Sequence, residues 1–329
     1  MIDFNSMFSK FNDLKIAVVG DIMLDTYMWG HVERISPEAP VPIVTLDKTE
    51  YRIGGAGNVA LNCTALGAQV SMFSVIGEDE DADKLLRLLT KNKIETATVL
   101  QSSNRSTTNK IRVISRNQQM MRLDHETTSD LLAIDEERLL TRLLEFIVVE
   151  KPTVLIFEDY NKGVLTEKVI TAAIESCKTH GIVTAVDPKR KNFFTYKGVD
   201  IFKPNLKEVK EGLNLLTDDV DTKSLNDIHA ALHEILAHKI SLITLSEKGV
   251  YWQRENDYEI IPSHVRTIAD VSGAGDTVIA VAAMTYGVTK DSALMAAMAN
   301  IAGGVVCEEV GTAAISKKRL QEECELLLN

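Results

Sequence analysis

Short apolar runs alternate with segments of helical periodicity along most of this chain. The first run, Lys15 to Val19, ends at Gly20 and Asp21. Later runs that predict buried strands are Met72 to Ile76, Thr153 to Phe157, Ile182 to Val186, Asp200 to Phe202 and Leu242 to Leu245. Amphipathic helices are predicted near Asp79 to Lys91, Thr166 to His180 and Asn226 to His238. This alternation is typical of an α/β fold with a doubly wound, largely parallel sheet.

Two segments depart from the alternation and predict a small β flap, or lid. Residues 27–52 read as short extended pieces separated by prolines, which are excluded from central strands. Residues 111–124 read as a hairpin around the polar turn Ser115 to Gln119. We expect these lid segments to close over a substrate and to exclude water.

Composition narrows the class of protein. The chain has 329 residues and no linker-like or low-complexity tract, so we expect a single domain over residues 1–329. A net charge of −11 argues against a nucleic-acid partner. Four scattered cysteines without a C-x-x-C pair suggest free thiols in a reducing compartment. Without a leader-like first segment or a long apolar stretch, we expect a cytoplasmic protein that does not enter a membrane.

The candidate chemistry is concentrated in the stretch Asp270 to Thr277, which is followed at once by the apolar run Val278 to Met284. Glycines where a helix begins leave backbone N–H groups exposed and form a nest for an anion. We expect Asp276, inside this electropositive turn, to stay ionised and to accept a proton from a substrate hydroxyl. Such a site suits phosphoryl transfer, although a glycine-rich turn with an aspartate cap would look the same.

Further polar residues follow predicted strands, where open α/β sheets bind ligands. Asp21 and Asp25 are candidates for holding substrate hydroxyls, or they cap turns. Asn205 and Glu208 open a helix, either as a capping box or as a pair that holds water around Mg²⁺. The small residues of the last predicted helix, Ser292 to Cys307, would let a flat base or another backbone approach.

One competing motif points to a different class of enzyme. The residues from Gly55 to Ala60 satisfy the dinucleotide fingerprint G-x-G-x-x-A, with Glu78 and Asp79 about 20 residues later. The motif follows proline-rich extended pieces instead of the first buried strand, so its context disfavours a dehydrogenase. A P-loop sequence is absent.

Three motifs in this order resemble the PfkB/ribokinase family of sugar kinases: Gly54-Gly55-x-x-Asn58, Asn205-x-x-Glu208 and the loop ending at Asp276. The resemblance spans nearly the whole chain and implies a ribokinase-like fold. Finer matches resemble bacterial D-glycero-β-D-manno-heptose 7-phosphate kinases, namely Gly20-Asp21-x-x-Leu24-Asp25, Arg34 to Pro42, Arg116 to Met120 and Asp270 to Thr277.

That resemblance implies transfer of the ATP γ-phosphate to the anomeric O1 of the heptose 7-phosphate, for ADP-heptose and lipopolysaccharide core. Many such kinases are fused to a nucleotidyltransferase domain, and we expect this chain to be a stand-alone kinase. The implied catalytic residues are the base Asp276 and the amides of Gly273, Ala274 and Gly275. The implied sugar-binding residues are Asp21, Asp25, Gly54, Gly55 and Asn58.

The resemblance also implies ATP, Mg²⁺ and a monovalent cation such as K⁺. The implied nucleotide contacts are Asn205, Leu206, Lys207, Glu208, Ser246, Gly249 and Asn300. Glu208 would contact Mg²⁺ through water, and Asp270 with Ser272 matches the monovalent-cation position. Many relatives carry glycine in place of Ser246. Pairing of two flaps into a homodimer is expected to cover the exposed strand edges.

A phosphate at the far end of the sugar needs a second cationic site. Arg112 and Lys162 are the first candidates, followed by Arg116, Arg122 and Lys189. Two alternatives stay open: another sugar kinase of the family, with ribose, fructose or a fructose phosphate as acceptor, and a sugar-phosphate sensor that performs no catalysis. The intact Asp276 argues against the sensor, which needs no base.

Overall fold

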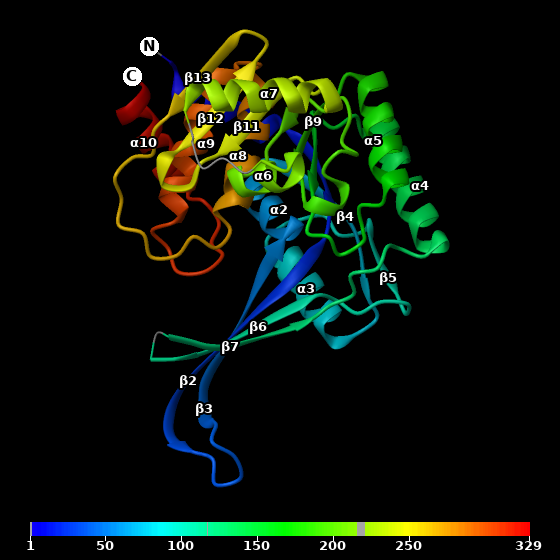
Figure 1. The fold of residues 1–329 in the computed structure, drawn as a ribbon. Helices are drawn as coiled ribbons and strands as arrows, with labels where there is room; N and C mark the ends of the chain where they lie inside the picture. Colours follow the sequence, from blue (N-terminus) through cyan, green and yellow to red (C-terminus); the bar gives the residue numbers. More distant parts are fainter. Residues whose placement is uncertain (1, 117, 216–220) are drawn as a thin grey trace.

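The computed structural model describes residues 2–116, 118–215 and 221–329 and shows a layered body with a projecting lid (Figure 1). Within the described residues the body contains a nine-stranded sheet in the order β13-β12-β11-β10-β9-β8-β1-β4-β5. Its strands are β1 Lys15–Gly20, β4 Gln69–Gly77, β5 Val99–Ser102, β8 Val154–Glu158, β9 Val183–Asp187, β10 Ile201–Phe202, β11 Ile240–Thr244, β12 Val250–Arg254 and β13 Asp257–Ile261. The expected doubly wound α/β fold is confirmed.

Parallel pairing brings the ends of the central strands to one edge of the sheet. Gly20 of β1 pairs with Glu158 of β8, and Glu158 pairs with Asp187 of β9. Because these strands are parallel, their carboxyl ends and the loops that follow lie together, at the edge where open α/β sheets bind ligands. The sequence therefore gathers the polar residues after β1, β8 and β9 at one place.

Helices cover both faces of this sheet. The strands alternate their side chains between two hydrophobic clusters, so that Ile16 and Val18 of β1 enter one cluster and Ala17 and Val19 the other. The first cluster is formed with α1 Phe4–Lys10, α2 Ala56–Ala65, α3 Glu80–Lys91, α8 Ala274–Thr289, α9 Ser292–Val306 and α10 Lys317–Leu328. The second is formed with α4 Ala133–Glu150, α5 Glu167–His180, α6 Leu206–Leu213 and α7 Thr222–Leu236.

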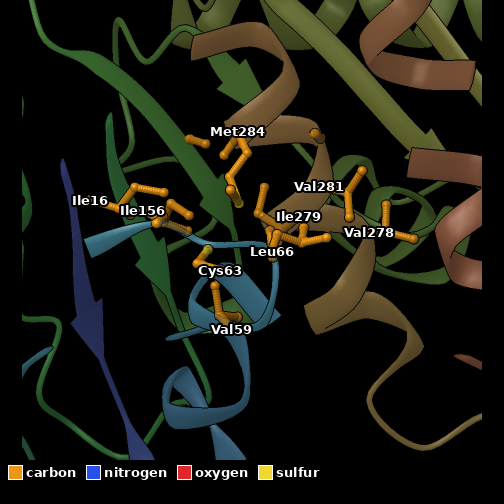
Figure 2. Close-up of a cluster of buried hydrophobic side chains, with 14 of the residues drawn as sticks. Ile16, Val59, Cys63, Leu66, Ile156, Val278, Ile279, Val281 and Met284 are labelled. Carbon is orange, nitrogen blue, oxygen red and sulfur yellow. The ribbon is translucent and has the colours of Figure 1, made fainter. Parts of the chain in front are cut away.

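Helix α8 is apolar on nearly all sides and lies in the centre of the first cluster. Every residue from Asp276 to Tyr286 is buried. Figure 2 shows its Ile279 and Met284 beside Cys63 and Leu66 from the region of α2. A helix buried on all sides is fixed rigidly by its packing, so its N-terminus is a firm platform for chemistry.

The lid is a separate sheet with the order β3-β2-β6-β7 among the described residues. Its strands are β2 Ile22–Ile35, β3 Pro42–Gly55, β6 Asn109–Ser115 and β7 Gln118–His125. A second sheet is found in the segments predicted to form the lid, and its closure over a substrate stays a prediction. The prediction of short pieces between residues 27 and 52 is wrong. Pro37 and Pro40 lie in the turn and Pro42 begins β3, so no proline interrupts either 14-residue strand.

Other boundaries also differ from the sequence prediction. The helix from Ser292 is not the last one, because α10 follows it. Helix α7 begins at Thr222, before the predicted Asn226. Within the lid hairpin, Asn117 of the predicted turn lies outside the described residues. In the described part of the chain, no helix combines the length and the apolar character needed to cross a membrane.

Candidate active site

The N-terminus of α8 faces the polar edge of the sheet. Its N-cap, Gly273, has φ 79°, a left-handed conformation that disfavours side chains. A Cβ on Gly273 would also lie 2.7 Å from the Asn58 amide nitrogen. A Cβ on Gly275 would lie 3.6 Å from an Asp187 carboxylate oxygen and 3.7 Å from the Lys203 ammonium. The first turn of α8, in which Ala274 and Gly275 are half-buried, therefore has a lysine in front of it, as an anion site requires.

Asp276 lies in this first turn and is 3% exposed. Its Oδ2 accepts a hydrogen bond from Asn58 Nδ2 at 2.7 Å, and its Oδ1 accepts one from the Tyr160 hydroxyl at 2.8 Å. Burial raises the pKa of Asp276 to about 6. Burial therefore outweighs the electropositive turn in setting this pKa, and a carboxyl group with such a pKa is still mostly ionised at pH 7. A pKa close to neutrality suits a general base.

Glu158 and Asp187 lie beside Asp276, and single carboxylate oxygens of the three residues fall within 4.8 Å of one another. Asp187 accepts from the Lys203 ammonium at 2.7 Å and from Lys189 at 3.3 Å. Neither carboxylate oxygen of buried Glu158 has a hydrogen-bond partner among the described residues. Burial and the charge of Asp187 raise the pKa of Glu158 well above its usual value.

Lys203 and Glu158 were missed as site residues by the sequence analysis. Lys203 is 2% exposed, and a lysine is so deeply buried only when its charge is paired, here with Asp187. Its only sequence signal is its position directly after the short strand β10, and Glu158 similarly closes β8. Both face the α8 N-terminus because parallel strands end at the same edge.

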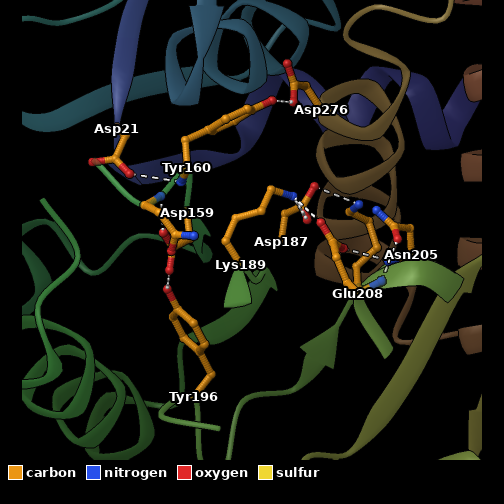
Figure 3. Close-up of polar contacts among 11 residues, drawn as sticks. Asp21, Asp159, Tyr160, Asp187, Lys189, Tyr196, Asn205, Glu208 and Asp276 are labelled. Atoms are coloured by element: carbon orange, nitrogen blue, oxygen red, sulfur yellow. Dashed lines mark hydrogen bonds and ion pairs between the residues drawn. The ribbon is translucent and has the colours of Figure 1, made fainter. Parts of the chain in front are cut away.

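Asn205 and Glu208 form a capping box at the start of α6. Asn205 Oδ1 accepts from the Glu208 N–H at 2.8 Å, and Glu208 Oε2 accepts from the Asn205 N–H at 2.8 Å. Glu208 Oε1 accepts from Lys189 Nζ at 2.6 Å, which links the box to Asp187 (Figure 3). Asn205 and Glu208 thus form the capping box that the sequence left open, and Glu208 also contacts Lys189. Leu206 and Lys207 are the first helical residues, and the exposed Lys207 pairs with Glu211.

Asp21 organises the loop after β8. Its carboxylate accepts from the backbone N–H groups of Tyr160 at 2.9 Å, Lys162 at 3.0 Å and Val164 at 3.1 Å. Its backbone carbonyl accepts from Ala56 N at the start of α2. Asp21 therefore has the turn-capping role that the sequence left open, and it fixes the loop that carries Tyr160.

Asp25 and the glycines at the end of β3 lie at the root of the lid. Asp25 forms an ion pair with Arg112 at 2.6 Å, so two residues predicted to bind substrate bind each other. A Cβ on Gly54 would lie 2.3 Å from the Asp25 carboxylate, and glycine is needed for this close approach. Gly55 is the N-cap residue of α2, one turn before Asn58.

Three cations, which we call the lid-base cations, gather near this root: Lys110, Arg112 and Lys162. Lys162 forms an ion pair with Glu126 at 2.7 Å. Lys110 Nζ lies 5.4 Å from the centre of the Tyr160 ring, and no hydrogen bond or ion pair of its ammonium is found among the described residues. Burial and the nearby Lys162 lower the pKa of Lys110. The carboxylates of Asp25, Asp124 and Glu126 also act on the charge of Lys110, and together the three cations could donate to an anion.

The other predicted phosphate contacts lie elsewhere. Arg122 is exposed on β7 and pairs with Asp124 at 2.9 Å. Arg116 has φ 46° in the lid turn. Lys189 is engaged by Asp187 and Glu208, on the side of the α8 N-terminus. Of the five sequence candidates, only Arg112 and Lys162 belong to the lid-base cations, and Lys110 was missed.

The residues predicted near a nucleotide base converge beyond β11. Ser246 has φ 58°, a left-handed conformation that glycine adopts more readily than serine. A Cβ on Gly249 would clash with the backbone of Ile261 and Pro262, and Asn300 Nδ2 donates to the Pro262 carbonyl at 2.9 Å. Gly249, just before β12, and Pro262, just after β13, therefore lie close together, and Asn300 of α9 lies beside Pro262.

Asp270 and Ser272 form a closed loop before α8. One Asp270 oxygen accepts from both the N–H and the hydroxyl of Ser272, at 2.9 and 2.8 Å, and the other accepts from Gly311 N at 2.9 Å. These donors hold the carboxylate in place. A monovalent cation would have to share its oxygens with them.

Comparisons with known proteins agree with this geometry. A model of the family described as "pfkB family carbohydrate kinase" matches residues 13–319. Proteins named "Bifunctional protein HldE" are similar in sequence: that of Sulfurimonas denitrificans is 38% identical over 94% of this chain, and that of Desulfatibacillum aliphaticivorans 39% over 96%. The chain spans only 64% of the length of each of these relatives.

Solved structures share the fold at low identity. Phosphofructokinase-2 from Escherichia coli in complex with potassium has a TM-score of 0.80 and 16% identity, with 96% of this chain and 100% of that chain covered. Arabidopsis thaliana ribokinase complexed with ribose and ATP has a TM-score of 0.73 and 15% identity, with 94% and 99% covered.

Proposed function

Since this chain belongs to the pfkB family of carbohydrate kinases, we propose that it transfers the γ-phosphate of ATP to the anomeric O1 of D-glycero-β-D-manno-heptose 7-phosphate. The family makes the chain a phosphotransferase that acts on an alcohol group. The proposed acceptor rests on the motifs that resemble heptose 7-phosphate kinases and on the charges of the cleft. The product would be the 1,7-bisphosphate that leads to ADP-heptose and lipopolysaccharide core.

The observation that carries the proposal is the unpaired Lys110 beside Lys162, away from the α8 N-terminus. The nest of α8 faces Lys203 and receives one phosphate. The lid-base cations supply a second anion site, and the ring of Tyr160 separates the two, because its hydroxyl reaches Asp276 while Lys110 lies against the ring. An acceptor with a reactive hydroxyl at one end and a phosphate at the other fits this arrangement.

The catalytic groups have separate tasks. Asp276 takes the proton of the O1 hydroxyl while the N–H groups of Gly273 to Gly275 hold the transferred group. Lys189 and Lys203 neutralise charge that develops between donor and acceptor. Asn58 holds the base, and the Gly54 and Gly55 segment forms the floor under the sugar.

Mg²⁺ fits the carboxylate oxygens at this edge of the sheet. Oxygens of Glu158, Asp187 and Asp276 lie within 4.8 Å of one another, and both Glu158 oxygens lack a donor among the described residues. Hard cations prefer such ligands. Asp187 and Glu158 would hold the ion, with Glu208 in contact through water, and Mg²⁺ would neutralise the ATP phosphates. A K⁺ site at Asp270 and Ser272 is proposed by analogy with the Escherichia coli enzyme whose structure contains potassium.

We propose that residues 1–329 form one kinase domain and that two copies form a homodimer through the lid. All eight residues of the edge strand β7 are exposed, and Met120, Met121 and Leu123 are among them. An exposed apolar edge strand is a pairing site, and a second copy of the same strand would cover it.

A product assay tests the acceptor. The purified protein is incubated with ATP and Mg²⁺ and, separately, with heptose 7-phosphate, the unphosphorylated heptose, ribose, fructose and fructose 6-phosphate. We expect the highest kcat/KM with heptose 7-phosphate and a new anomeric phosphate signal by ³¹P NMR. Preference for an unphosphorylated sugar would overturn the proposed acceptor, and ATP turnover with none of these sugars would favour a sensor.

A further inference from the structure

Tyr160 connects the base to both ends of the cleft. It follows β8 by two residues, and the Asp21 carboxylate fixes its backbone N–H at 2.9 Å. Its hydroxyl donates to Asp276 Oδ1 at 2.8 Å (Figure 3). The backbone of Tyr160 is therefore held by Asp21, and its hydroxyl contacts the base Asp276.

The ring of Tyr160 contacts a lysine from each side of the active site. Lys110 Nζ of the lid strand β6 lies 5.4 Å from the ring centre. Lys189 Nζ, which binds Asp187 and Glu208 at the nucleotide side, lies 5.5 Å from the same centre. Ammonium groups at this distance attract the face of an aromatic ring. The side chain of Tyr160 thus contacts Lys110 of the lid, Lys189 and the base Asp276.

Asp276 depends on this contact for its orientation. Asn58 of α2 holds the second carboxylate oxygen at 2.7 Å. A carboxylate has about four lone-pair positions, so two donors leave acceptor capacity for a substrate hydroxyl. Without the Tyr160 hydroxyl, Oδ1 would lose its only side-chain donor among the described residues, and the carboxylate would be held at one oxygen alone.

On the premise that Asp276 is the catalytic base, we propose that Tyr160 is a positioning residue through which the lid sets the orientation of that base. Closure of the lid over an acceptor moves β6, and Lys110 presses on the ring whose hydroxyl holds Asp276. The orientation of the base then depends on where the lid holds the ring of Tyr160. The lid on this reading controls alignment as well as access of water.

The experiment compares Tyr160→Phe with Tyr196→Phe. The Tyr196 hydroxyl donates to Asp159 Oδ2 at 2.8 Å, and Tyr196 is fully buried whereas Tyr160 is partly buried. Its loss therefore controls for the removal of a tyrosine hydroxyl from a carboxylate. For Tyr160→Phe we expect kcat to fall about tenfold, because one hydrogen bond to a charged group contributes roughly this much. The KM values for ATP and for the acceptor should not change. For Tyr196→Phe we expect a lower Tm and an unchanged kcat.

A double-mutant cycle tests the link to the lid. Lys110→Met should lower kcat at saturating acceptor in the wild-type background, and the loss should largely disappear in the Tyr160→Phe background. Wild-type kcat in Tyr160→Phe, a change in KM alone, or independent multiplication of the two losses would overturn the inference. The cycle uses whichever sugar proves to be the best acceptor, so its outcome does not depend on the identity of the heptose.

Discussion

At Asp276, one substitution can remove the ability to accept a proton and leave the shape of the side chain almost unchanged. In Asp276→Asn the amide keeps the volume and retains acceptor capacity towards Tyr160, but it cannot take a proton. We expect kcat to fall on the order of 10²- to 10⁴-fold. Calorimetry should show ATP binding largely unchanged, because the nest of backbone N–H groups is retained. If the variant keeps more than half of the wild-type kcat, Asp276 is not the base.

The same residue predicts the acid limb of the pH profile. Burial raises the pKa of Asp276 to about 6, and only the ionised form accepts a proton. Activity is therefore full above this pKa and is lost as the pH falls through it. We expect kcat/KM to decline tenfold per unit below about pH 6. A profile that stays flat down to pH 5 would contradict this assignment.

The lid-base cations can be tested against a matched surface charge. Lys110→Met and Lys162→Met should each lower kcat/KM for heptose 7-phosphate by about ten- to a hundredfold, since charge-assisted contacts are worth roughly 1.5 to 3 kcal/mol. The loss should shrink with the unphosphorylated heptose. Arg122→Met removes an exposed cation of the same lid and should change neither. Equal losses with both sugars would place the distal phosphate elsewhere.

At the scale of elements, the sequence predicted those whose pattern is local. Strand β8 and helix α5 were found within a residue or two, because their apolar runs and caps are contiguous. Helix α4 was missed, and exposed Val148 and Val149 at its end blur the periodicity of its buried face. The antiparallel strands β12 and β13 at the edge of the main sheet were not anticipated either.

The site shows the same division between local and long-range information. Asp276 and the α8 nest follow from one continuous stretch of sequence. The partners of Asp276, Asn58 and Tyr160, come from positions 218 and 116 residues away. The spacing of residues along the chain does not predict such pairs. The places of Lys110 and Lys203 in the site likewise follow only from the folded structure.

The edge strand β7 offers a test of assembly. Met121 and Leu123 are 55% and 50% exposed on the same face of this strand. Replacing both with glutamate puts like charges on the proposed pairing surface. We expect sedimentation to change from dimer to monomer at micromolar concentration, with the Tm of the body little altered. A wild-type monomer, or a variant that still dimerises, would remove β7 from the interface.

The stability of the whole molecule should depend on pH through a buried histidine cluster far from the catalytic residues. His229 and His238 share the Ser241 hydroxyl at 2.8 and 2.7 Å, and the ring of His233 stacks on His229. Burial lowers the pKa of His229 to about 4 and that of His238 to about 3. Below about pH 6.5 these histidines therefore bind protons in the unfolded chain, whereas in the folded chain they stay neutral.

The direction of this proton binding determines how the stability of the protein changes with pH. Stability contributed by the neutral histidines is present above pH 6.5 and is lost as the pH falls towards 4. We expect the Tm to drop steeply over that interval and His238→Gln, which removes one titrating group, to flatten the drop even if it lowers the Tm at pH 7.5. His180→Gln is the matched control, because His180 is exposed on the last turn of α5. Parallel curves of Tm against pH for all three proteins would show that acid unfolding starts elsewhere.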